Sequence, residues 1–454
     1  MTGTVSLAQR LAVGGLVRRL ETEGGQRIPI GFLAPLSGQV RSWGLPGLYG
    51  CQIWADQINA SGGMMIGGRR HQVEIMAEDC GYDPDRALTG ARRLVQDGNV
   101  RFLMMLGGDS LRRLRPWLTE RKILTSTLLP SDLSPDTPYL IAPSETHPLF
   151  NVTAVGWLAS THPDLKRVAL CSQMDELGLP SLATYRAAFG AGEFQITKEI
   201  RYPNTGGDAE EIVAAMLASD PQILCWCTSH TPMVHALTEA AFRQGFTGQI
   251  LSCTADGYRE LIGKTSAAFM EGFLFQFPDF DDPALQDKSF FFNRPMQFHT
   301  EYERRFPGSW GSVSWEYAAT LDLWHMAVQK AGTVAPVSVL AAMKHGGRGE
   351  HAFGHARWLG SDFYGNDNLL AGDWPVVRIT GGQARIVGFG SIPAWLSEHG
   401  ARLRQEMEAL GQMWYQRQGK DPLPIRDTTL DSAASAEPSL PASEASAPRS
   451  VKAW

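Results

Sequence analysis

The stretch IPIGFLAPLSG, residues 28–38, is a short apolar run that ends in proline, serine and glycine. A run of this length followed by turn-forming residues predicts a strand that stops near Pro35. Downstream, apolar residues recur at positions 48, 51, 54, 55 and 58. That spacing predicts a helix with one buried face. Residues 28–58 therefore indicate a strand, a loop and a helix, which is the repeating unit of a parallel α/β sheet.

The same alternation continues along the chain. Strands are predicted at 73–77 and 102–106, with a helix at 84–95 between them. After the second strand, FLMML, a glycine-rich turn leads into a predicted helix that carries Arg112, Arg113 and Arg115. The rhythm then restarts, with strands expected at 168–171, 194–200, 223–227 and 250–253 and helices at 180–189, 210–218 and 233–244. Two such series predict two parallel-sheet lobes, and ligands of these sheets bind beyond the carboxyl ends of the strands.

Two amphipathic segments follow the alternating region. Residues 315–331 are expected to form a long helix with a buried stripe. A second helix is expected at 395–415, with Leu403, Met407, Leu410 and Trp414 on one face. This stripe must be covered, either by the chain's own lobe or by a partner in a homodimer. Residues 432–448 contain 14 Ala, Ser or Pro out of 17, so the tail from 419 to 454 is expected to be disordered.

Composition limits the class of protein. The chain has 454 residues, several times the roughly 150 expected for one domain, so more than one core is expected. Its net charge is −6, which argues against a nucleic-acid partner. No apolar run approaches the roughly 20 residues that cross a bilayer, so a membrane-embedded protein is not expected.

Sequence patterns of catalytic and metal sites are missing or incomplete. The chain has no GxSxG elbow and no HExxH, and Gly263-Lys264-Thr265 lacks the spacing of a phosphate loop. His351 and His355 lie four residues apart but lack a third ligand, so they are interpreted as surface or turn histidines. No enzyme activity, metal or cofactor is therefore expected.

The six cysteines lie at positions 51, 80, 171, 225, 227 and 253 and include no CxxC pair. They are expected to be buried thiols, while a disulfide between Cys51 and Cys80 stays open. The best candidate for an export signal, LAVGGLV at residues 11–17, is short and is followed by charge, so no export signal is expected. Six cysteines without an obvious pairing fit a reducing compartment slightly better than an oxidising one.

Three motifs occur in a characteristic order, namely residues 30–38 (IGFLAPLSG), Trp43-Gly44 and residues 58–63 (INASGG). This opening resembles that of type I periplasmic binding proteins of the leucine/isoleucine/valine and amide/urea group. Asp83-Pro84, preceded by Glu78 and Asp79, is similar to the family's second strand–helix unit. Residues 313–321 resemble its return helix, and the resemblance covers about residues 28–392.

The resemblance implies two lobes joined by three crossovers, with a small-molecule ligand in the cleft and no cofactor. Lobe 1 would comprise residues 28–145 and 279–345, and lobe 2 residues 146–278 and 346–392. Residues 1–27 would be an extension and residues 393–418 a terminal helix. The implied function is a solute-binding protein without enzyme activity, for an ABC importer and its permease. A cytoplasmic amide-type sensor is the alternative, so both periplasmic and cytoplasmic locations stay open.

The resemblance also implies ligand-binding positions. An aromatic residue would line the cleft, hydroxyls in lobe 1 would hold a carboxylate or amide, and lobe 2 would hold an ammonium or amide group. Carried over one at a time, these positions are Trp43, Ser110, Ser131, Ser229, Thr254 and Asp256. Asp109 is added because its carboxylate would disfavour a ligand carboxylate, unless it is only an N-cap. Leu177 stands where the family commonly has an aromatic residue, so amino acids, amides, ureas and small organic acids all stay open as ligands.

Overall fold

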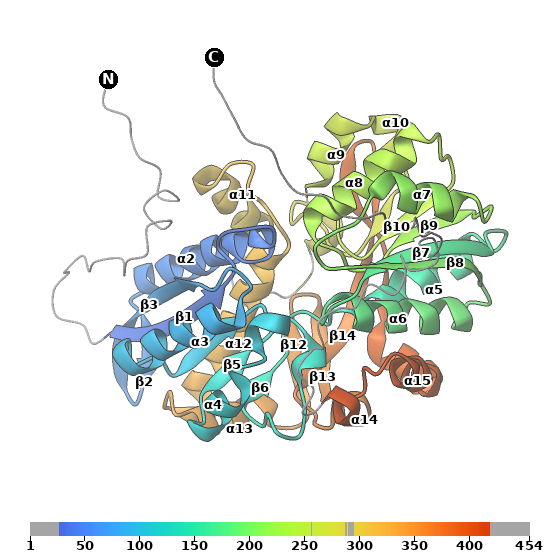
Figure 1. Ribbon diagram of the computed structural model, residues 1–454. Helices are drawn as coiled ribbons and strands as arrows, with labels where there is room; N and C mark the ends of the chain where they lie inside the picture. The colour runs from blue at the N-terminus through green and yellow to red at the C-terminus, as the bar shows by residue number, and fades with distance from the viewer. Residues whose placement is uncertain (1–26, 256, 287, 289–294, 418–454) are drawn as a thin grey trace, which may run out of the picture. The chain divides into compact units, whose positions relative to one another are not determined.

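The computed structural model describes residues 27–417 except 256, 287 and 289–294. Two sheets, each covered by helices, form the two lobes (Figure 1). The sheet of lobe 1 has the strand order β2-β3-β1-β4-β5-β6, and all pairs except β2–β3 are parallel. Its strands are β1 (Arg27–Ala34), β2 (Met64–Ile66), β3 (Arg69–Asp79), β4 (Phe102–Met105), β5 (Leu124–Ser126) and β6 (Leu140–Ile141).

The sheet of lobe 2 combines a parallel part with an antiparallel part. Its order is β12-β13-β14-β11-β10-β9-β7-β8, and β15 also pairs with β14. Strands β7 to β11 run parallel, whereas every pair that involves β12 to β15 is antiparallel. The strands are β7 (Arg167–Gln173), β8 (Gln195–Tyr202), β9 (Ile223–Trp226), β10 (Gln249–Ser252), β11 (Leu274–Phe275), β12 (Arg348–His351), β13 (Gly354–Leu359), β14 (Leu369–Thr380) and β15 (Gln383–Ser391).

Helices cover the faces of both sheets, as doubly wound sheets require. Lobe 1 carries α2 (Leu45–Ala60), α3 (Pro84–Arg92), α4 (Arg115–Glu120), α11 (Pro295–Arg305), α12 (Val313–Ala331) and α13 (Pro336–Lys344). Lobe 2 carries α5 (Asn151–Thr161), α6 (Gly178–Ala191), α7 (Ala209–Leu217), α8 (Thr231–Arg243), α9 (Tyr258–Lys264), α10 (Ala267–Met270) and α15 (Ile392–Ala409). Short helices are η1 (Arg41–Trp43), η2 (Arg93–Asp97), η3 (Gly108–Leu111), η4 (Pro130–Asp132), η5 (Pro283–Leu285), α14 (Ser361–Tyr364) and α16 (Trp414–Arg417).

A close approach of α2 and α12 places the start of α12 at the cleft. A Cβ atom on Gly50 of α2 would lie 2.0 Å from the carbonyl oxygen of Ser314. Only glycine therefore fits there, and the first turn of α12 is held against lobe 1. Within the described residues no single helix is both long and apolar enough to cross a membrane, and α12 and α13 reach that length and composition only as a pair bent by 103°.

Three details of the sequence interpretation are corrected. The helix expected at 395–415 ends at Ala409, because Gly411 takes a left-handed backbone with φ 69°, and α16 is separate. The arginine-rich helix after β4 begins only at Arg115, with Pro116 in its first turn. The antiparallel strands between 348 and 391 were not predicted as strands at all.

The C-terminal helix α15 packs mainly on α6 of its own lobe. Leu403 and Met407 are buried there, and Arg186 of α6 pairs with Glu406 across the contact at 3.5 Å. Two of the four residues of the apolar stripe, Leu403 and Met407, are thus covered by the chain's own lobe. The expected disordered tail, residues 419–454, lies outside the described residues.

The surroundings of His351 differ from the expectation, whereas the six cysteines are buried as expected. His351 is buried on β12 against Phe353 and Trp374, and is not a surface histidine. Its Nδ1 accepts the backbone N–H of Phe353, and the side chain lies in a hairpin, not on a helix. All six cysteines are buried thiols, so the disulfide between Cys51 and Cys80 is not formed. Among the described residues no cluster of histidine, cysteine or carboxylate side chains could hold a metal.

Candidate ligand-binding cleft

A cavity lies between the two lobes. It opens where the order of each sheet reverses, at the carboxyl ends of the parallel strands. Loops after β1, β4 and β5 line it from lobe 1, and loops after β7, β9, β10 and β11 line it from lobe 2. The crossover after β6 and the start of α12 complete it. The lining residues are Trp43, Leu106, Leu129, Glu145, His147, Leu177, Thr228, Thr254, Phe277, Ser312 and Val313.

Six of the eleven lining residues are apolar, and the other five are polar or charged. Two aromatic rings and four aliphatic side chains form more than half of it, and no lysine or arginine is among the lining residues. Glu145 brings a carboxyl group that is largely buried. The cavity therefore suits a small body without strong charge, because a buried anion would have no cationic side chain in the wall to pair with.

His147 is the most constrained polar residue of the cavity. Its Nε2 lies 2.6 Å from the hydroxyl oxygen of Thr228, and that hydroxyl donates to the sulfur of Cys253 at 3.0 Å. Since the single hydroxyl proton points to sulfur, the imidazole Nε2–H must donate to Thr228. Nδ1 is then a bare acceptor, and it is buried without a partner among the described residues. Burial lowers the pKa of His147 to about 3, so the ring is neutral at neutral pH.

The two lobes touch at the mouth of the cavity. Ser42 of lobe 1 and Thr231 of lobe 2 share a hydrogen bond of 2.9 Å between their hydroxyls. The ring of Trp43 meets that of His230 edge-on, with centroids 5.7 Å apart. Beyond this pair lies an outer, more polar hollow lined by Gln39, Gln173 and the 204–207 loop. The structure therefore describes a closed cleft in which Trp43 and His230 separate the inner cavity from the outside.

The structure brings only part of the expected site together. Trp43 and Thr254 both line the cavity. Ser110 donates its hydroxyl to the carbonyl oxygen of Gly107 at 2.7 Å and is not a lining residue. Ser229 donates to the carbonyl oxygen of Cys227 at 3.2 Å and also bonds the hydroxyl of Tyr202. These two serines serve local structure.

Ser131 and Asp109 are not among the lining residues of the cavity. Ser131 is buried on η4, and its hydroxyl has no partner among the described residues, but it is not in the lining. Asp109 is not an N-cap, because η3 begins after Gly107 without a side-chain cap. Burial raises the pKa of Asp109, and the carboxylate of Asp175 across the cleft raises it further. Asp256 lies outside the described residues.

Sequence reasoning missed several lining residues. Glu145 and His147 belong to a crossover that was predicted at the boundary of the lobes but was not considered for ligand contacts. Thr228 directly precedes Ser229, which was chosen in its place. Phe277 follows β11, a strand that had not been predicted. The sequence feature that could have identified Glu145 and His147 is the polar segment at residues 144–147, because it lies at a lobe boundary and crossovers form the floor of such a cleft.

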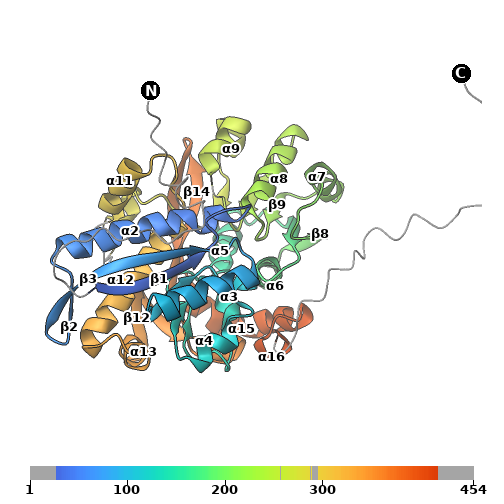
Figure 2. The same ribbon diagram turned by 60° about the vertical axis from the view of Figure 1, so that its left-hand side comes forward.

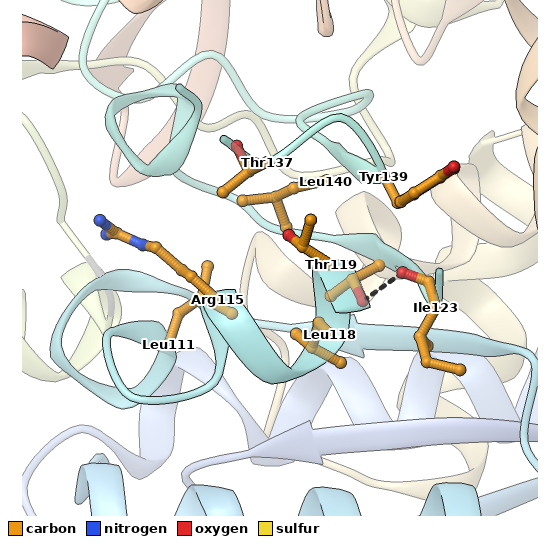
Figure 3. Close-up of a pocket in the computed structure, with 9 residues that line it drawn as sticks. Leu111, Arg115, Leu118, Thr119, Ile123, Thr137, Tyr139 and Leu140 are labelled. Carbon is orange, nitrogen blue, oxygen red and sulfur yellow. Dashed lines mark hydrogen bonds between the residues drawn. The ribbon is translucent and has the colours of Figure 1, made fainter. Parts of the chain in front are cut away.

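A second hollow lies inside lobe 1 between α4 and the strands β5 and β6 (Figure 3). Four of its nine lining residues are aliphatic, namely Leu111, Leu118, Ile123 and Leu140. In Figure 3 the guanidinium of Arg115 points away from these side chains, and it pairs with Asp132 at 2.9 Å. This hollow shares no residue with the cleft cavity.

The family model for periplasmic binding proteins matches residues 27–384. The chain belongs to the periplasmic binding protein family. This match confirms the resemblance of the opening motifs and the two-lobed α/β fold. Members of the family are solute-binding proteins and not enzymes, so this binding protein is non-enzymatic.

Solved structures of low identity share the fold of this periplasmic binding protein. An ABC-transporter solute binding protein from Rhodopseudomonas palustris, in complex with 4-hydroxybenzoate, is 17% identical with a TM-score of 0.67 over 82% of this chain and 99% of that one. An ABC transporter substrate-binding protein from Sphaerobacter thermophilus is 18% identical, with a TM-score of 0.66 over 81% and 98%. A leucine binding protein from Thermotoga maritima is 16% identical, with a TM-score of 0.63 over 80% and 99%. No curated protein matches the sequence.

Proposed function

We propose that this binding protein closes on a small ligand with an aromatic or branched apolar body and a head group that donates hydrogen bonds. The observation that carries the proposal is the combination of an apolar wall with a buried acceptor. The wall includes Trp43, Leu177 and Phe277, and the acceptor is the bare Nδ1 of His147. An amide or ammonium group would donate a hydrogen bond to this nitrogen.

This choice narrows the ligand classes that the sequence left open. A lone carboxylate is disfavoured because no cationic side chain lines the cavity. A small polar molecule such as urea would make few contacts with the apolar side chains of the wall. Solved relatives bind 4-hydroxybenzoate or leucine, which have bodies of the proposed kind. Leucine and aromatic or aliphatic amides are therefore favoured over benzoate and urea.

A thermal-shift panel tests this choice with matched pairs. We expect benzamide to raise the melting temperature more than benzoate, and leucine and leucinamide to raise it more than urea, at equal concentration. A ligand at 100 times its dissociation constant stabilises the folded state by about 2.7 kcal/mol. A larger shift with benzoate than with benzamide would contradict the proposed head group, and a flat response to the whole panel would contradict the proposed ligand class.

We further propose that the protein delivers its ligand to the permease of an ABC importer, opening and closing at the crossovers near residues 145, 278 and 345. Support comes from the family and from solved relatives that are ABC-transporter components. Small-angle scattering with and without the best compound of the panel tests the closure. A smaller radius of gyration with ligand is expected, and identical curves would contradict closure.

A further inference from the structure

Cys253 ends the hydrogen-bond chain that begins at His147 in the cavity. It directly follows β10, is fully buried and is not among the lining residues. Its sulfur accepts the hydroxyl proton of Thr228 at 3.0 Å, and the oxygen of that hydroxyl lies 2.6 Å from the Nε2 of His147. The first crossover and the loops after β9 and β10 are thus joined by one chain of three side chains, of which only His147 and Thr228 line the cavity.

Thr228 is held so that its hydroxyl stays between these two neighbours. Its backbone N–H donates to the hydroxyl oxygen of Ser181 at 3.1 Å, and the same oxygen accepts from the side-chain amide of Asn151 at 3.1 Å. Helices α5 and α6, which carry these two residues, pack on each other in lobe 2 (Figure 2). The backbone N–H of Cys253 in turn donates to the carbonyl oxygen of Trp226 at 2.9 Å. All five residues are fully or almost fully buried, so bulk water does not compete for the hydroxyl of Thr228.

The hydroxyl of Thr228 has a single proton, so it can donate to only one of its two neighbours. When the sulfur of Cys253 receives that proton, the hydroxyl oxygen accepts from the imidazole, and Nε2 of His147 carries the ring proton. Without the sulfur, Nε2 would be the remaining neighbour. The hydroxyl would then donate to Nε2, and the proton of the neutral ring would move to Nδ1. Because burial lowers the pKa of His147 to about 3, the change is one of tautomer and not of charge at neutral pH.

We propose that Cys253 is a specificity-determining residue of the cleft, which sets the tautomer of His147 without touching the ligand. The inference rests on the proposed function, because it concerns the head group that the cavity accepts. Cys253 is a positioning residue, since it acts through Thr228. With cysteine at position 253, Nδ1 accepts a hydrogen bond and favours a head group that donates one. A side chain without an acceptor at this position would turn Nδ1 into a donor, and the same cavity would favour head groups that only accept.

Nitrogen-15 NMR of protein labelled at histidine tests the tautomer without a ligand. The protonated and the bare nitrogen of a neutral imidazole give well separated signals, and the signals of His147 are those that disappear in His147→Asn. We expect Nε2 to carry the proton in the original protein and Nδ1 to carry it in Cys253→Ala. Cys171→Ala is the matched control, because it removes a fully buried thiol on β7 that lies outside the cavity lining, and it should leave the proton on Nε2.

Ligand preference gives a second readout. Benzamide and acetophenone have similar shapes, but only benzamide donates hydrogen bonds from its head group. We expect the ratio of their dissociation constants to shift in favour of acetophenone by roughly tenfold in Cys253→Ala, since the variant exchanges an acceptor for a donor at one hydrogen bond. Cys171→Ala should keep the ratio of the original protein. Calorimetric titration of each compound measures both constants.

A ring proton on Nδ1 in the original protein would overturn the proposal, as would a Cys253→Ala variant that keeps the proton on Nε2. Equal changes in Cys253→Ala and Cys171→Ala would overturn it too, and so would an unchanged preference for benzamide in a variant whose tautomer has changed. Cys253→Val, which also lacks an acceptor, replaces Cys253→Ala if that variant does not melt cooperatively. A flat response of the original protein to the whole ligand panel would instead contradict the proposed function. The tautomer is measured without a ligand, so the two failures are distinguishable.

Discussion

The Nε2 of His147 and the hydroxyl of Thr228 lie 2.6 Å apart and join the first crossover to the carboxyl end of β9. This contact couples the floor of the cleft to lobe 2 and determines which imidazole nitrogen stays free. The proposed head-group preference rests on this contact, because the unprotonated nitrogen of a neutral imidazole can only accept a hydrogen bond.

Thr228→Val removes the acceptor of this contact and keeps the side-chain shape. The buried Nε2–H of His147 then lacks a partner, which costs about 1–3 kcal/mol. Urea unfolding should show this loss. Thr300→Val on the exposed face of α11, where the hydroxyl bonds the carbonyl oxygen of Met296, should change the free energy of unfolding much less. Equal losses in both variants would show that the contact contributes nothing specific.

Trp43→Ala should abolish the thermal shift produced by the best compound of the panel, because it removes an aromatic wall of the cavity. Ser110→Ala should leave that shift intact, since its hydroxyl is bonded to Gly107 and lies outside the lining. The comparison separates ligand contact from loop structure. A normal ligand response in Trp43→Ala would show that the ligand binds elsewhere.

Asp322 should make the protein less stable as pH rises from about 4 to about 7. It is buried in α12, accepts a hydrogen bond of 2.7 Å from Trp54, and burial raises its pKa to about 7. Between the unfolded and folded pKa values the folded state binds more protons, so stability falls with rising pH and is then level. Asp322→Asn removes this penalty, with a gain of up to about 4 kcal/mol at pH 8 and almost none at pH 3. Chemical denaturation at both pH values measures it, and equal gains would contradict the assignment.

His351 should have the opposite pH dependence. Burial lowers its pKa to about 4, below the unfolded value near 6.5, so its contribution is complete above pH 6.5 and is lost as pH falls toward 4. His351→Asn keeps an acceptor for the Phe353 amide but cannot titrate, and we expect a flatter pH profile of unfolding free energy in that window. The same change at exposed His345 should leave the profile as steep as in the original protein.

Leu403→Ala in α15 should cost about 2–5 kcal/mol, as for a buried leucine in a packed core. Gln405→Ala on the exposed face of the same helix is the control. Light scattering on both variants should give the mass of the original protein. A dimer lost only in Leu403→Ala would instead support a seam between two copies.

The opening motif at residues 28–38 and the helix at residues 45–60 could be predicted from the sequence, because apolar spacing and turn residues report local backbone structure directly. The two-lobed fold followed from repeated units of this kind. Trp43 was also predicted, since it follows the first strand of a recognisable motif.

Glu145, His147 and Phe277 were decided only by tertiary structure, because the cavity forms where segments distant in sequence converge. No local sequence pattern indicates that the hydroxyl of Ser110 donates a hydrogen bond to Gly107. Nor does one indicate that the hydroxyl of Thr228 accepts a hydrogen bond from the imidazole of His147. The burial of Leu403 against α6, and the ion pair of Arg417 with Glu176, likewise depend on how the C-terminal helices fold back. Sequence periodicity determines which face of an element is apolar, whereas the packing of the whole chain decides what that face meets.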